Sequence, residues 1–113
     1  MSDEIIEPRK RTIPEHPARI VDLFGELTED HSKVRVSLEL DRGDTKPDIN
    51  LSLIDKDGNE VSRADIIELF GESMAFTMHI RQKDPIFPLI LVCRMSYVDD
   101  AVHDERKTEI RDL

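Results

Sequence analysis

The fold of this chain is decided by VRVSLEL (34–40), in which every second residue is apolar. The same period recurs in INLSL (49–53) and MAFTMHI (74–80). Successive side chains of a strand point to opposite faces, so each stretch predicts a strand with one buried face and one solvated face. Several such strands in one chain predict an antiparallel sheet protein whose sheets each keep one face in water.

Further strands are predicted around these three. The segment 89–98 is apolar along one face and at the start of the other, so it is expected to be the most buried strand and to lie centrally. The pair Asp57 and Gly58 predicts a hairpin turn, because glycine adopts positive φ at little cost. The apolar residues of the returning strand do not keep a regular spacing of two, which indicates a β-bulge near Ser62 and Arg63. The predicted strands are 20–24, 33–41, 48–55, 61–66, 74–81, 89–98 and 104–112.

This number and spacing of strands resembles immunoglobulin-like and fibronectin type III-like domains. The chain has no Trp and a single Cys, so it lacks the core Trp and the inter-sheet disulfide of antibody domains. The resemblance implies a seven-stranded antiparallel β-sandwich over residues 18–113 and a tendency to mediate contacts. It does not specify a function, because one fold serves many functions.

Two segments, 18–30 and 62–71, also fit short helices. They overlap the similar heptads IVDLFGE (20–26) and IIELFGE (66–72). Ser62 and Asp65 form a pattern close to a helix capping box, whereas Gly25 would weaken a helix. If both segments are helices, the order αβββαββ resembles the small acidic secretion chaperones. That alternative α+β fold implies a regulatory or chaperone-like protein that holds a basic client.

Length, charge and composition limit the function classes. The chain has 113 residues, which is enough for one domain, and a formal net charge of −9. Residues 1–17 are rich in Pro and charge and lack an apolar period, so they predict a disordered tail. The acidic balance argues against nucleic-acid binding, which requires a basic surface. No signal-peptide pattern or membrane-length apolar run occurs, so a cytoplasmic location is expected.

No catalytic, cofactor or zinc-binding motif is recognisable in the sequence. Cys93 lies in an apolar run and is expected to be a small buried side chain. The stretch DKDGNE (55–60) lacks the glycine and glutamate spacing of an EF-hand and is expected to be a hairpin. Carboxylates from separate turns offer a weak calcium site, formed by Asp41, Asp44, Asp48, Asp99 and Asp100. Apart from that alternative, we expect no enzyme activity, cofactor, metal site or small-molecule substrate.

A polar patch is predicted where two strands lie side by side. In a sandwich of this order, the strand 74–81 neighbours the strand 33–41. Their outward residues then form a mixed-charge surface of Arg35, Ser37, Glu39, Thr77, His79 and Arg81. This patch is the candidate protein-contact site.

The sequence therefore favours a non-enzymatic protein-interaction or scaffold module that binds another protein or a second copy of itself. Strand addition at an open sheet edge is one way to bind. The segments 18–24 and 104–112 are the expected edges.

Overall fold

The computed structural model describes residues 18–41, 43, 46–67, 71–96 and 102–112. These residues form seven strands and contain no helix. The strands are β1 (Arg19–Leu27), β2 (Lys33–Asp41), β3 (Asp48–Ile54), β4 (Glu60–Ile66), β5 (Ser73–His79), β6 (Leu89–Ser96) and β7 (Val102–Ile110). The predicted tail, 1–17, lies outside the described residues.

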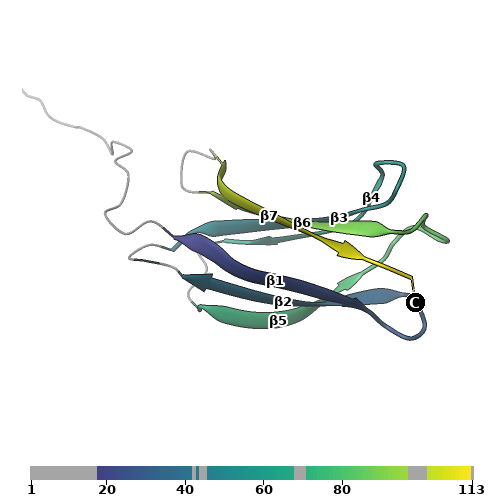
Figure 1. Ribbon diagram of the computed structural model, residues 1–113, viewed down its shortest axis with the longest axis horizontal. Coiled ribbons are helices and arrows are strands. Elements are labelled where there is room, and N and C mark those ends of the chain that lie inside the picture. The colour runs from purple at the N-terminus through teal and green to yellow at the C-terminus, as the bar shows by residue number, and fades with distance from the viewer. Residues whose placement is uncertain (1–17, 42, 44–45, 68–70, 97–101, 113) are drawn as a thin grey trace, which may run out of the picture.

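Two antiparallel sheets face each other (Figure 1). One sheet has the order β1-β2-β5, and the other has the order β4-β3-β6-β7. The prediction of a mainly-β sandwich is confirmed. The strand β6 lies between β3 and β7, so the central position predicted for 89–98 is also confirmed.

The core lies between the sheets and follows the predicted alternation. On β2 the inward residues are buried and the outward ones are largely exposed, in strict order from Val34 to Leu40. On β6 the inward residues Leu89, Leu91, Cys93 and Met95 are fully buried. Burial of such side chains from both sheets is the main stabilising term of the fold.

The segments that also fitted helices are strands, so the α+β alternative is wrong for the described residues. A β-bulge lies within the first segment and directly before the second. On β1, Ile20 pairs with Leu40 but Asp22 pairs with Glu39, which leaves Val21 as an extra residue. A bulge changes the spacing of inward residues from two to three, and a spacing of three is also what a helix produces.

The bulge on β4 has the same effect. Ile54 pairs with Glu60 and Leu53 pairs with Ser62, so Val61 is the extra residue, just before the predicted position. Residues 68–70, the rest of that predicted helix, lie outside the described part of the chain.

The hairpin predicted at 57–58 is confirmed. The N–H of Asp55 donates to the carbonyl of Asn59 at 2.9 Å, and Gly58 has a φ of 89°. That φ lies in the left-handed region, which glycine adopts without steric cost.

The edge strands β1 and β7 lie against each other and link the two sheets. The N–H of Ile20 donates to Oδ2 of Asp104 at 2.8 Å. The guanidinium of Arg106 donates to the carbonyls of Ile20 at 3.1 Å and Val21 at 3.3 Å. Both predicted edge segments are therefore at sheet edges, but part of the β1 edge is already occupied by β7 side chains.

Candidate interaction surface

The predicted polar patch lies on the outer face of the three-stranded sheet. The expected pairing of 74–81 with 33–41 is confirmed, since Arg35 lies opposite Thr77 and Lys33 lies opposite His79. Ser37 and Glu39 complete the exposed row on β2. Arg81 follows the end of β5, and its N–H donates to the carbonyl of Val61 in the other sheet at 2.9 Å.

The strand β1 adds residues that the sequence did not assign to this surface. Phe24 lies opposite Ser37, and Glu26 lies opposite Arg35. The Phe24 side chain is 55% exposed. The bulge at Val21 reverses the phase of β1, and recognising it from sequence would have required knowing the pairing with β2. We call this surface the contact face and define it as Phe24, Glu26, Arg35, Ser37, Glu39, Ala75, Thr77 and His79.

Phe24 is surrounded by small side chains within its own row of the sheet. The next residues across the sheet are Ser37 on β2 and Ala75 on β5, and both are exposed. Such neighbours do not cover the ring. The centre of the contact face therefore presents an accessible aromatic side chain.

Charge is distributed unevenly along β2. Its outward residues are basic at the start (Lys33 and Arg35), neutral at Ser37, and acidic at the end (Glu39 and Asp41). Asp41 pairs with Arg19 at 3.6 Å. Within the described chain, Arg35 and Glu39 form no ion pair or hydrogen bond through their side chains.

The outer face of the four-stranded sheet differs in this respect. Arg94 pairs with Glu105 at 3.0 Å, and Arg63 pairs with Asp65 at 3.2 Å. Asp65 also accepts a hydrogen bond from Asn50 at 2.8 Å. These four charged side chains form ion pairs across or along the strands, whereas Arg35 and Glu39 of the contact face form none among the described residues.

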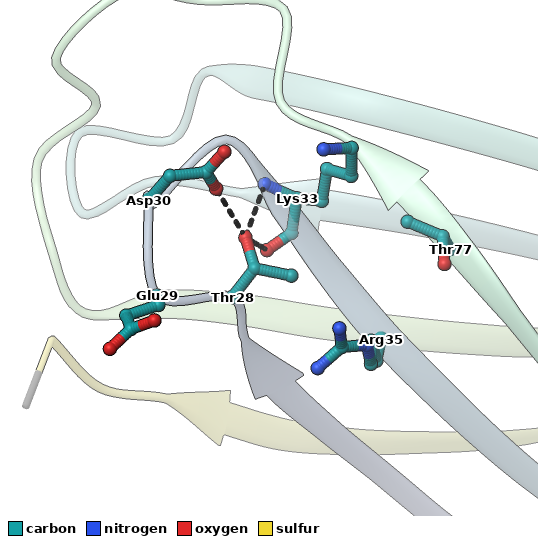
Figure 2. A pocket seen from close by; sticks show the side chains of 6 residues that line it. All are labelled: Thr28, Glu29, Asp30, Lys33, Arg35 and Thr77. Atoms are coloured by element: carbon teal, nitrogen blue, oxygen red, sulfur yellow. Dashed lines mark hydrogen bonds between the residues drawn. The ribbon is translucent and has the colours of Figure 1, made fainter.

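A shallow depression of about 550 Å³ lies at one end of the contact face (Figure 2). Its lining residues are Thr28, Glu29, Asp30, Lys33, Arg35 and Thr77. The carboxylate of Asp30 accepts hydrogen bonds from the hydroxyls of Thr28 and Ser32, each at 2.8 Å. These bonds, the one from the Ser32 hydroxyl foremost, hold the pKa of Asp30 well below its usual value. Through its Oδ1 atom, Asp30 thus stabilises the β1–β2 hairpin.

The carboxylate of Asp55 is also used internally. It is only 3% exposed and accepts hydrogen bonds from the N–H groups of Asp57 and Asn59, each at 2.9 Å. The backbone bond from Asn59 is the main reason why the pKa of Asp55 is lowered. DKDGNE is therefore a self-satisfied hairpin, as predicted.

The described residues contain no group of three or more His, Cys, Asp or Glu side chains that would hold a metal ion. Of the proposed calcium carboxylates, Asp41 and Asp48 are described, and Asp44, Asp99 and Asp100 lie outside that part of the chain.

Cys93 lies on the inner face of β6 and is fully buried, as expected. Burial raises the pKa of its thiol to about 12. A buried thiol with such a pKa is not a nucleophile at neutral pH. Within the described residues, no helix is long and apolar enough to cross a membrane.

No protein-family model and no curated protein matches this chain. Solved structures with a similar fold include three bacterial β-glucuronidases. The enzyme of Bifidobacterium dentium is 9% identical with a TM-score of 0.59, and the match covers 85% of this chain and 18% of the enzyme. Matches to the enzymes of Ruminococcus gnavus (13% identity, TM-score 0.55) and Lactobacillus rhamnosus (17%, 0.53) each cover 85% of this chain and 16% of the enzyme.

This chain therefore spans less than a fifth of each glucuronidase. At such low identity the likeness shows a β-sandwich fold and nothing more specific.

Proposed function

We propose that this chain is a non-enzymatic protein-interaction module that binds a protein partner through the contact face. The observation that carries the proposal is the exposed ring of Phe24, set among Ser37 and Ala75 and close to the unpaired charges of Arg35 and Glu39.

Protein interfaces draw most of their affinity from a few central residues, which are often aromatic side chains or arginine. The contact face offers both types side by side, because Phe24 and Arg35 lie on adjacent strands one row apart. A partner that covers Phe24 would also supply the acidic and basic groups that Arg35 and Glu39 lack within the described chain. Charge complementarity of this kind selects the partner and its orientation.

We also propose that the sandwich is of the immunoglobulin-like type. In that type, strands 1, 2 and 5 share one sheet, and strands 3, 6 and 7 share the other. The strand order of this chain agrees with both groups, and its fourth strand joins the second sheet. Many domains of this architecture act in cell-surface and adhesion proteins, although architecture alone does not assign a partner.

The similarity to parts of β-glucuronidases shows the sandwich fold, and this fold is compatible with a module role. A fold that makes up 16–18% of a large enzyme is a building block of that enzyme. The thiol of Cys93 is buried in the core, and the carboxylate of Asp55 and the Oδ1 atom of Asp30 accept hydrogen bonds from the fold itself.

The test is the affinity for a partner isolated with the full chain. Phe24→Ser removes the central ring and is expected to weaken binding about tenfold or more, as truncation of a hot-spot aromatic does. Ile86→Ser is the matched control, because Ile86 is also a large exposed apolar side chain, at 45%, but lies in the β5–β6 loop. Equal affinities of both variants and the unmodified chain would remove the contact face from the proposal.

A further inference from the structure

The four edge strands of the two sheets are protected to different degrees. The β1 edge has backbone groups occupied by Asp104 and Arg106. The strands β7 (VHDERKTEI) and β4 (EVSRADI) carry several charged side chains, and β4 is also bulged. Charges and bulges are the devices by which natural sheets prevent edge-to-edge association.

The edge strand β5 has none of these devices. Its sequence is SMAFTMH, with no Lys, Arg, Asp, Glu or Pro. Its pairing with β2 runs without a bulge from Ser73 to His79. An unbulged, uncharged edge strand of this length is an open template for another strand.

The direction of the free backbone groups on β5 follows from the bonds at its two ends. The carbonyl of Glu72 accepts from Leu40, and the N–H of Ile80 donates to Ser32. Alternate residues of an antiparallel strand bond to opposite sides, so the even-numbered residues of β5 bond to β2. The N–H and C=O groups of Ser73, Ala75, Thr77 and His79 therefore point to the open edge. The described part of the chain provides no partner for them.

We propose that β5 pairs antiparallel with β5 of a second copy of this chain, about a two-fold axis at Phe76. Side chains that point into the core of one copy must lie beside core-facing side chains of the other copy. The two β5 strands overlap along their full length only when Phe76 lies opposite Phe76 of the second copy. Ala75 then lies opposite Thr77 of the second copy, and Ser73 lies opposite its His79. In this register, the backbone N–H and C=O groups of Ser73, Ala75, Thr77 and His79 in each copy gain hydrogen-bonding partners.

A second copy suits this edge because the register is self-complementary. The opposed outward residues are small or uncharged, so no like charges meet. On the inner face, Met74 and Phe76 are only partly buried in the single chain. In the pair, Met74 lies opposite Met78 of the second copy, and the two Phe76 rings adjoin.

The pairing is also closed. It joins the two three-stranded sheets into one sheet of order β1-β2-β5-β5-β2-β1, and each copy uses its unprotected edge once. Such an isologous contact ends at a dimer. The pairing does not depend on the proposed function, because it uses backbone groups of β5 and leaves Phe24 exposed.

The direct test is amide hydrogen exchange of the full chain over a range of protein concentrations, with sedimentation measured in parallel. The amides of Ala75 and Thr77 are expected to become protected as dimer accumulates. The amide of Phe76, which bonds to β2, is expected to be protected at every concentration. A chain that stays monomeric at millimolar concentration overturns the proposal, as does a dimer in which Ala75 and Thr77 exchange freely.

The register is tested by two double variants that share Thr77→Lys and differ only at position 75. Ala75→Glu with Thr77→Lys places Glu opposite Lys at both symmetric positions and is expected to keep the dimer. Ala75→Lys with Thr77→Lys places Lys opposite Lys and is expected to raise the dimer dissociation constant about tenfold or more. Both variants keep the same Lys beside Arg35, so a stability change from that neighbour is common to both. Equal dissociation constants overturn the pairing of residue 75 with residue 77.

Discussion

A glycine in the middle of β1 is required by a side chain of β7. A Cβ atom on Gly25 would clash with Cδ1 of Ile110 and lie 3.2 Å from Cδ2 of Leu91 and 3.4 Å from Cγ1 of Val34. Ile110 is only 2% exposed, so its side chain has little room to move away. We predict that Gly25→Ala destabilises the fold and that Ile110→Val, which removes Cδ1, relieves much of the effect.

The magnitude follows from two opposing terms. Overpacking a well-packed core costs about 1–3 kcal/mol. Replacing glycine by alanine within a strand stabilises the fold by about 0.5–1 kcal/mol, because the unfolded chain loses conformational freedom. The single Gly25→Ala variant should therefore lose about 1 kcal/mol, within a range of roughly 0–2.5 kcal/mol. Ile110→Val alone should lose about 0.5–1.5 kcal/mol. In the double variant the new methyl group occupies the space of the removed one.

The assay is a double-mutant cycle of unfolding free energies from urea denaturation. The double variant should be more stable than the sum of the single losses by about 1 kcal/mol. Gly25→Ala with Ile49→Val is the control, since Ile49 is equally buried but does not contact Gly25. The reasoning is refuted if Gly25 and Ile110 are additive to within about 0.5 kcal/mol, as independent sites are.

Three further predictions concern named groups. The thiol of Cys93 should not react with a thiol reagent in the folded protein at neutral pH, because burial raises its pKa to about 12, and it should react on unfolding. The pKa of Asp55 is lower in the folded state than in the unfolded state, where it is about 4. The ionised carboxylate therefore stabilises the fold above about pH 4, and this contribution is lost as the pH falls through the folded-state pKa. Asp55→Asn should therefore reduce stability at pH 7 and make the acid limb of a stability–pH profile shallower; an unchanged limb would contradict this. Asp104→Ala should lower the unfolding free energy from urea denaturation by about 1–2 kcal/mol and speed hydrogen exchange of the Ile20 amide, which loses its acceptor. Unchanged exchange would show that the bond between Ile20 and Asp104 is not formed.

The sequence predicted those parts of the fold that depend on local pattern. The strict alternation of β2 predicted its two faces, and the continuous apolar run of β6 predicted its central position. The glycine at position 58 predicted the hairpin. Each of these features is set by neighbouring residues or by the backbone preference of one residue.

The sequence did not determine the parts that depend on long-range contacts. The bulge at Val21 is defined by how β1 pairs with β2, so the segment fitted a helix as well as a strand. For the same reason the exposure of Phe24 could not be predicted from the sequence. In the sequence, Gly25 is informative only as a residue that weakens a helix. Its close approach to Ile110 could not be predicted, because the two residues lie at opposite ends of the chain.

The candidate site was predicted in part. Five residues of the predicted patch lie along one face because β5 pairs with β2, which strand order alone suggested. Arg81 lies beyond the strand end, where its backbone bonds to Val61 of the other sheet. The unpaired state of Arg35 and Glu39 could not be predicted, since it depends on which side chains reach each other across strands.

We propose that the three-stranded sheet, and not the four-stranded one, carries the interaction surface. The most direct measurement is photo-crosslinking in cells of the source organism, with a photoreactive phenylalanine at position 24 or at position 107. Phe24 lies on the contact face, and Lys107 is exposed on the outer face of β7. We expect a discrete protein adduct from position 24 that weakens when Arg35 is changed to Glu, and none from position 107. An adduct from position 107 alone, or none from either position, would contradict it.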